Sequence, residues 1–527
     1  MHHLPRLIAL RAAAISAFLF CMPTPVCASA TLAAAAEPAH PGCERATPRQ
    51  CVALAISAMG GEGKLSGVHS EQLDIVEHRS IAEQSYRQAP FLTAYSHIHR
   101  TVDFEHGRMA IETHLIWPES DVGPKQADSR TTVVATPDAA VVRTPTGDRP
   151  GSRTAIDQAR DILALGPEHL LLTAEAATDL HFMPDETLRA TPHTVVAFDW
   201  HGIPVKILLN RFNHLPDAME STRTFDDFWY AWGDVTQRVY FSNWKVVQGV
   251  VYPTTWIEER NGLPWESAQV LDATFNVKLD DKLSAMDPKA AAESTQHAFR
   301  NIPFSITKHI TLAPGVDLYQ GPWSVTIVRQ DNGVLMLEAP ISPRFVKGAL
   351  DKARDLYPSL PIKAVLTTSD SWPHIAGVRQ AVAEKLPVYA LDLNLPILKR
   401  MVAAPHTLRP DDLQTHPELA HWVAVSGMHQ IGRGPNRVVL YPLRGASTGR
   451  QYMVYFPGHR LLYASDTLVL ESAHKLYDPE LMREVMQAVE REHLPVDTVY
   501  AMHQGPVPWS HVVGLVTAAM RNSNGDK

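Results

Sequence analysis

The sequence predicts an α+β protein of 527 residues that is built in two parts. Pairs of extended segments separated by turn residues run from residue 94 to 277, which is typical of an antiparallel sheet. From residue 310 onwards strands alternate with helices in two successive sets, which predicts two packed sheets with helices outside. Hydrophobic residues make up 45% and charged residues 20% of the chain, so a disordered chain is excluded.

The first thirty residues have the features of a secretory signal peptide. Arg6 and Arg11 precede a short apolar stretch at 12–21, and Ala28-Ser29-Ala30 has the A-x-A form of a cleavage site. We therefore expect cleavage after Ala30 and export to the periplasm, with secretion as the alternative. The apolar stretch is too short for a membrane anchor, so no transmembrane segment is expected in the mature chain.

Two cysteines remain in the mature chain, Cys43 and Cys51. An even pair of cysteines in an exported protein predicts a disulfide, and two free thiols are the alternative. Residues 31–46 around the first cysteine are rich in Ala and Pro, which is typical of a flexible lead-in.

A β-rich N-terminal domain is expected over residues 47–277. A helix at 49–59 opens it and ends at Gly60-Gly61, and two further helical stretches at 154–165 and 168–177 interrupt the strands. The order of an opening helix and a strand meander resembles periplasmic half-barrel domains of the lipoprotein-carrier type. Five tryptophans are concentrated near its end and are interpreted mainly as core residues, with some lining an apolar groove: Trp229, Trp232, Trp244, Trp256 and Trp265.

A polar, Ala-rich linker with a helix is expected over 278–307, followed by the second domain over 308–520. Its first set has strands at 315–319, 322–329, 333–338, 362–366 and 387–390 and helices near 343–356 and 374–385. The second set has strands at 421–426, 437–442, 450–456, 460–463 and 496–501, a helix at 479–492 and a last helix.

Residues 308–512 resemble the metallo-β-lactamase superfamily. The resemblance is carried by these segments, in family order: Val316-Asp317-Leu318-Tyr319, the run from Gly333 to Pro340, Ala364-Val365-Leu366-Thr367-Thr368, His374-Ile375-Ala376-Gly377-Val378-Arg379, the run from Arg460 to Asp466, and Tyr500-Ala501-Met502-His503. It implies an αββα sandwich whose loops hold one or two metal ions.

The metal-binding motif is degenerate. The family motif Thr-His-x-His-x-Asp-His falls on residues 368–374, where serines replace both early histidines, proline replaces the aspartate and only His374 remains. The next family histidine falls on Ser447, whereas Asp466 and His503 match family ligands. By this resemblance the chain lacks the three histidines of the first metal and keeps the ligands of the second.

His374, Asp466 and His503 therefore form a candidate site for one metal, with zinc as the expected ion. In this hypothesis metal-bound water attacks a carbonyl or phosphoryl centre of a small-molecule substrate, and the protein is a hydrolase. Asp370 is the predicted proton acceptor and, with His374, a predicted catalytic residue. Ser369, Ser371 and Ser447 are expected to line the vacated part of the cleft.

Other interpretations stay open at this point. The same ligands suit a mononuclear iron oxygenase, and each could instead have a structural role in a non-catalytic periplasmic ligand-binding protein without metal. A serine near His374 could act as the nucleophile of a Ser-His-Asp arrangement, although the sequence has no G-x-S-x-G elbow. His97 and His99 share one face of a strand, but no third ligand accompanies them.

The charge balance restricts the partners. Acidic residues outnumber basic ones and the formal net charge is −8, which lacks the basic character of a dedicated nucleic-acid-binding protein. A small molecule is the expected partner, and the sequence does not define the oligomeric state.

Overall fold

The computed structural model describes residues 43, 45–84, 91–116, 129–280, 285–294, 299–304 and 308–525. The predicted signal peptide, 1–30, and most of the lead-in lie outside these residues. Cys43 and Cys51 are joined in a disulfide. No helix of the described ranges is long and apolar enough to cross a membrane.

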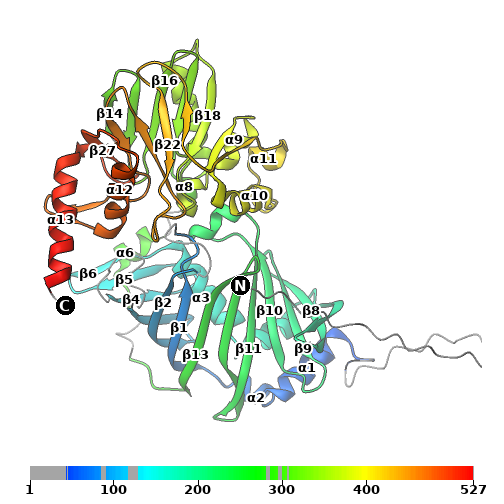
Figure 1. The fold of residues 1–527 in the computed structure, drawn as a ribbon. Coiled ribbons are helices and arrows are strands. Elements are labelled where there is room, and N and C mark those ends of the chain that lie inside the picture. Colours follow the sequence, from blue (N-terminus) through cyan, green and yellow to red (C-terminus); the bar gives the residue numbers. More distant parts are fainter. Residues whose placement is uncertain are drawn as a thin grey trace, which may run out of the picture.

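The N-terminal part is one antiparallel sheet of thirteen strands, open at its edge strands β6 and β7. Figure 1 shows this sheet below the C-terminal part. From edge to edge the strands are β6 (Gly147–Pro150), β5 (Ala140–Thr144), β4 (Ser129–Ala135), β3 (Arg108–Ile116), β2 (Thr93–Asp103), β1 (Ser70–Ser80), β13 (Leu263–Phe275), β12 (Val250–Arg260), β11 (Val235–Val247), β10 (Pro216–Arg223), β9 (Ile203–Asn210), β8 (Thr191–Trp200) and β7 (His181–Leu188). The expectation of an antiparallel β-rich part is confirmed.

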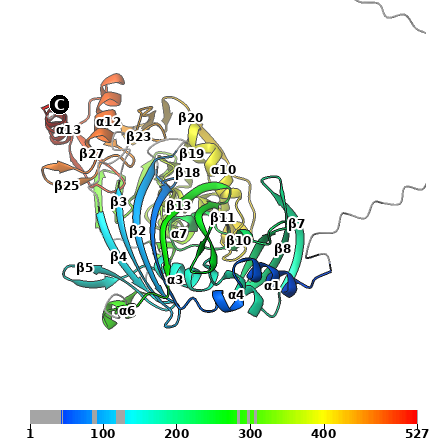
Figure 2. The ribbon, with the colours of Figure 1, turned by 90° about the horizontal axis from the view of Figure 1, so that it is seen from below.

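Helices pack on the inner face of this curved sheet (Figure 2). Thr47 caps α1 (Pro48–Ala58) in a capping box with Gln50, and Ser152 caps α3 (Arg153–Leu165). The remaining short helices are α2 (Glu62–Leu65), α4 (Leu170–Ala176) and the 3₁₀ turn η1 (Phe228–Trp232). Apolar residues of α1 and α4 pack against β8–β13, whereas α3 packs against β2–β5, so the two ends of the sheet have separate apolar clusters.

Two short helices fall in the predicted linker, α6 (Pro288–Glu293) and the 3₁₀ turn η2 (Phe299–Asn301). Ala290 of α6 packs against Val134 and Val141 of the large sheet. This part of the predicted linker is therefore attached to the edge of the N-terminal sheet.

The C-terminal part contains two facing sheets. The seven-stranded sheet has the order β14 (Lys308–Ala313), β15 (Val316–Gln320), β16 (Val325–Gln330), β17 (Gly333–Leu337), β18 (Ile362–Thr367), β19 (Val388–Leu391), β20 (Trp422–Val425). The six-stranded sheet has the order β21 (His429–Ile431), β22 (Val438–Pro442), β23 (Tyr452–Phe456), β24 (Leu461–Tyr463), β27 (Thr498–Tyr500), β28 (Val507–Pro508). A small pair, β25 (Leu470–Ser472) and β26 (Lys475–Leu476), lies apart.

Buried residues from both sheets, such as Leu318, Leu335, Leu440 and Val454, form one apolar layer between them. Helices α7 (Pro343–Leu356), α9 (Val378–Ala383) and α10 (Leu395–Ala403) cover the seven-stranded sheet, and α11 (Asp412–Thr415) packs nearby. Helices α12 (Pro479–Arg491) and α13 (Trp509–Gly525) cover the six-stranded sheet. The predicted order of helix, sheet, sheet and helix is confirmed.

The expected helix at 374–385 is two helices, α8 (Trp372–Ile375) and α9, separated by Gly377. A Cβ at Gly377 would lie 2.2 Å from the Val346 side chain and 2.6 Å from the Ser342 carbonyl oxygen, so the chain approaches α7 too closely for any other residue.

The two parts of the molecule meet at α8. The Trp372 ring packs edge-on against Trp229 and Trp232, with centroids 4.6 and 5.4 Å apart, and Trp265 packs against Trp229 from the sheet. The Trp372 backbone N–H also donates to the carbonyl oxygen of Glu83, at 3.0 Å. Three of the five tryptophans singled out in the sequence thus belong to the interface that holds α8.

Candidate metal centre

The three predicted ligands are brought together at one edge of the sandwich. His374 lies on α8, which follows β18 of the seven-stranded sheet. Asp466 and His503 follow β24 and β27, which are parallel neighbours in the six-stranded sheet. Because parallel strands end at the same edge of a sheet, the loops after β24 and β27 emerge side by side.

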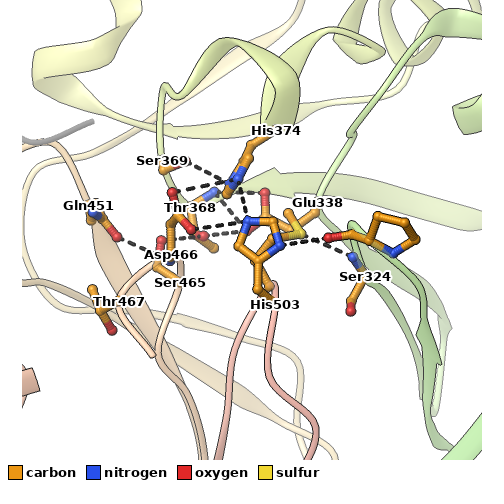
Figure 3. Close-up of polar contacts among 12 residues, drawn as sticks. Ser324, Glu338, Thr368, Ser369, His374, Gln451, Ser465, Asp466, Thr467 and His503 are labelled. Atoms are coloured by element: carbon orange, nitrogen blue, oxygen red, sulfur yellow. Dashed lines mark hydrogen bonds and ion pairs between the residues drawn. The ribbon is translucent and has the colours of Figure 1, made fainter. Parts of the chain in front are cut away.

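The ligand atoms of these residues converge (Figure 3). The Nε2 atoms of His374 and His503 are 3.2 Å apart. One Asp466 carboxylate oxygen, Oδ2, lies 3.5 Å from Nε2 of His374, and the other, Oδ1, lies 3.4 Å from Nε2 of His503. Among the residues that the structure describes, this is the one group of three or more His, Cys, Asp or Glu side chains with ligand atoms within 4.8 Å of one another.

The other ring nitrogen of each histidine has a different partner. Nδ1 of His503 donates to the Pro322 carbonyl oxygen at 2.6 Å, so Nε2 carries the lone pair in the neutral ring. Nδ1 of His374 is 3.3 Å from the Ser369 hydroxyl. Metal-binding histidines are usually oriented in this way, by a hydrogen bond from the nitrogen that does not bind the metal.

Burial controls the protonation of the group. It lowers the pKa of His374 well below its ordinary value, and neighbouring His503 lowers this pKa further. Burial raises the pKa of Asp466 to about 6, against the opposing effect of His503. At neutral pH His374 is therefore an unprotonated imidazole and Asp466 is largely ionised, which are the forms that bind a metal ion.

The donor set fits a zinc ion. Ligands about 2.0–2.1 Å from a tetrahedral zinc are separated by about 3.3 Å, close to the distances observed here. His374 is buried, whereas the side chains of Asp466 and His503 are 16% and 29% exposed. Three protein ligands facing solvent on one side would leave a fourth position open for water or substrate.

A second polar network, which the sequence did not predict, lies behind Asp466. The buried Glu338 carboxylate accepts hydrogen bonds from the Thr368 and Tyr463 hydroxyls, the latter at 3.0 Å. The Thr368 and Ser465 hydroxyls are 2.7 Å apart (Figure 3). Ser465 precedes Asp466 and has a φ of +58°, so this network holds the strained turn from which Asp466 projects.

Gln451 fixes Asp466 from another side, since its side-chain oxygen accepts the Asp466 backbone N–H at 3.1 Å. The one sequence signal for Glu338 was an acidic residue directly after the apolar strand β17. No local signal pointed to Gln451.

Asp370 lies outside the ligand group, although it is only four residues from His374. Its carboxylate is fully buried and ion-paired with Arg450, whose guanidinium also donates to the Gln84 carbonyl oxygen at 3.1 Å. Arg450 thus connects the His374 loop to the N-terminal part of the chain. The predicted role of Asp370 as proton acceptor stays a prediction.

The three predicted cleft serines are buried, and their contacts differ. Ser369 contacts His374, whereas the Ser447 backbone N–H donates to Glu484 of α12. The Ser369 hydroxyl contacts Nδ1 of His374, and Nε2 of His374 contacts Asp466, which is the order of a Ser-His-Asp arrangement. The Ser369 side chain, however, has no exposed surface that a substrate could reach.

The His97–Ile98–His99 segment lies on β2, away from this centre. Nδ1 and Nε2 of His99 contact Asp74 and Gln72, at 2.8 and 2.6 Å. Both ring nitrogens are thus used in polar contacts on the face of the sheet.

Comparison with known proteins gives structural matches only. No protein-family model matches the chain, and no curated protein does. A metallo-beta-lactamase from Pontibacter korlensis matches with 13% identity and a TM-score of 0.32, over 40% of this chain and 98% of the other. The DIM-1 metallo-beta-lactamase matches with 13% identity and a TM-score of 0.32, over 40% and 97%. The stereoselective inverting sec-alkylsulfatase Pisa1 from Pseudomonas sp. matches with 13% identity and a TM-score of 0.31, over 41% and 43%.

Proposed function

We propose that this protein is a hydrolase that uses one metal ion, zinc, bound by His374, Asp466 and His503. The observation that carries the proposal is the convergence of two imidazole Nε2 atoms and one carboxylate, with both Nδ1 atoms directed to other partners. Zinc in such a site lowers the pKa of bound water and polarises a carbonyl or phosphoryl oxygen.

The residues of the chain have separate tasks in this proposal. The Pro322 carbonyl oxygen and the Ser369 hydroxyl orient the two imidazoles. Asp466 supplies negative charge, and its turn is held by the Glu338–Thr368–Ser465 network. A substrate would approach from the side of Asp466 and His503, whose side chains are partly exposed. The acidic net charge of the chain favours a small molecule over a nucleic acid as substrate.

We also propose that the protein works after export, in the periplasm. The Cys43–Cys51 disulfide supports an oxidising compartment, and the A-x-A segment at 28–30 supports cleavage of a signal peptide. N-terminal sequencing of the protein from the periplasmic fraction should begin at Thr31; a chain that retains residues 1–30 in the cytosol would contradict export.

The test is elemental analysis and hydrolysis by the mature protein, purified without added metal or chelator. We expect about one zinc per chain, lost in His374→Ala/His503→Ala and kept in the matched control His429→Ala/His459→Ala, whose histidines lie outside the centre. Chromogenic carboxylate, phosphate and sulfate esters and a chromogenic β-lactam sample the classes of hydrolysis. At least one should be cleaved by the wild type and not by the double variant.

Each other outcome assigns the site differently. No metal in the wild type, even after incubation with zinc, would overturn the proposal. Iron instead of zinc would favour the oxygenase alternative, since two histidines and one carboxylate also suit non-haem iron. Zinc without hydrolysis would favour a binding protein.

In the same assays Asp370→Asn tests the proton-acceptor role: a lower kcat with full metal content and unchanged stability would support it, whereas lost stability would indicate only the Arg450 pair.

A further inference from the structure

A second cavity, of about 740 Å³, lies apart from the metal centre. It is formed by α3, the turn between β8 and β9, the end of β10 and, from the C-terminal part of the chain, residues 408–409. None of His374, Asp466 and His503 lines it. Its volume is in the range of small-molecule sites, which occur preferentially where two domains meet.

One end of the cavity is apolar. Ala164, Trp200 and Ile203 line it and pack at the margin of the large apolar cluster inside the N-terminal sheet. The rest of the lining includes charged residues, among them Arg153, Asp226 and Arg409. Helix α3 forms one wall of the cavity, along which Arg153 and Ala164 are separated by roughly 16 Å, with Arg160 between them.

Guanidinium groups outnumber carboxylates in the lining, which has four arginines and three aspartates. Arg223 and Asp161 neutralise each other through two hydrogen bonds of 2.6 Å. Asp226 is ion-paired with Arg300, which does not line the cavity. Nε of Arg153 donates to Asp157 at 3.1 Å, so the positive charge that remains has no equal negative charge inside the cavity.

Arg160 and Arg409 carry this positive charge. Nε of Arg160 donates to the Pro137 carbonyl oxygen at 2.7 Å, but its other nitrogens are 3.6 and 3.9 Å from the nearest carboxylates, those of Asp157 and Asp138. Nη1 of Arg409 is 4.0 Å from Asp226. These separations are longer than hydrogen bonds, so both guanidinium groups have donors to offer an anion.

Both arginines line the cavity beside an aspartate, Arg160 next to Asp157 and Arg409 next to Asp226. Burial raises the pKa of Asp226, and Arg409, Asp157 and Arg153 are all near enough to shift it. Asp157 is also the neighbour of Arg160. Leu408, beside Arg409, is 47% exposed and adds an apolar surface at the opening.

We propose that this cavity binds a small amphipathic anion. Its carboxylate or sulfate head group would bind Arg160 and Arg409, because guanidinium groups form strong charge-assisted hydrogen bonds with such oxyanions. Its apolar body would lie along Ala164, Trp200 and Ile203. This binding site is separate from the metal centre, and the proposal holds whether or not the protein is a hydrolase.

The experiment is a displacement titration on the full mature protein. The fluorescent probe is anilinonaphthalene sulfonate, an aromatic anion, and the competitors are decanoate and decanol, which share an apolar chain and differ in head-group charge. We expect saturable displacement by decanoate at one site per chain, and displacement by decanol that is at least tenfold weaker.

Variants decide where the anion binds. Arg160→Gln/Arg409→Gln should weaken decanoate at least tenfold and leave decanol unchanged, while the matched control Arg344→Gln/Arg433→Gln, on exposed arginines elsewhere, should leave both unchanged. Ile203→Asp should weaken both competitors. His374→Ala/His503→Ala should bind decanoate like the wild type, which separates this proposal from the metal site. Equal affinities for decanoate and decanol, no saturable binding, or full affinity in Arg160→Gln/Arg409→Gln would overturn it.

Discussion

The N-terminal sheet and the C-terminal sandwich each bury a cluster of titratable side chains, and the two clusters differ in how their charge is balanced. In the N-terminal cluster the Arg100 guanidinium lies 2.7 Å from the Glu71 carboxylate, and the Tyr252 hydroxyl donates to Glu71 at 3.5 Å. Burial, together with Glu71, raises the pKa of Glu168 well above its ordinary value. This cluster contains its own cation, Arg100, and its second acid, Glu168, is neutralised by protonation.

The C-terminal cluster of His374, Asp466 and His503 contains no permanent cation. At neutral pH Nε2 of His374 and the Asp466 carboxylate oxygens are hydrogen-bond acceptors, and they lie close to Nε2 of His503. The nearby guanidinium of Arg450 is already paired with Asp370. The N-terminal cluster is thus balanced by its own cation, whereas the converging ligand atoms of the C-terminal cluster leave room for a cation from outside.

The largest expected effect is on the N-terminal cluster. Arg100→Met should lower the free energy of unfolding by about 3–5 kcal/mol, because it leaves Glu71 buried without its counter-ion. Glu71→Leu/Arg100→Met should recover most of this loss, and Arg344→Met, at an exposed arginine, should change little. Urea titrations at neutral pH measure all three. A stable Arg100→Met variant would remove the distinction between the two clusters.

Zinc should act on the C-terminal cluster alone. At one hundred times its Kd, zinc should raise the free energy of unfolding of the wild type by about 2.7 kcal/mol, because it binds only the folded site. Glu71→Leu/Arg100→Met should keep this increment and His374→Ala/His503→Ala should lose it. Urea titrations with zinc and with chelator give the difference. An equal increment in the histidine variant would place the zinc elsewhere.

The smallest expected effect concerns Glu338, which stands beside the centre. Burial raises its pKa from 4.5 to about 7. Below pH 4.5 the group is protonated in both states; between 4.5 and 7 only the unfolded state ionises, so stability falls as the pH rises and the loss is complete above 7. Between pH 5 and 8 this amounts to about 2 kcal/mol.

Glu338→Gln, which does not ionise, should lack this contribution. The difference in stability between wild type and variant, measured on metal-free protein at both pH values, should therefore shift by about 2 kcal/mol in favour of the variant. A constant difference would mean that Glu338 is ionised in the folded protein throughout this range.

Much of the fold was predictable because it depends on local patterns. Apolar alternation and turn residues predicted the antiparallel part, and the two strand–helix sets predicted the sandwich. The helix predicted at 374–385 was wrong in one respect, its break at Gly377, because that break depends on contact with α7. No periodicity within the segment encodes such a contact.

The sequence names His374, Asp466 and His503 as candidate ligands because they match ligand positions of the family that residues 308–512 resemble. Tertiary packing brings the ligand atoms of these residues together, pairs Asp370 with Arg450 eighty positions away, and places Glu338 where its network supports the turn of Asp466. Backbone periodicity depends on residues that are neighbours in the chain, so it can be recognised in the sequence. Ligand geometry and ion pairing depend on loops that come together only when both sheets pack.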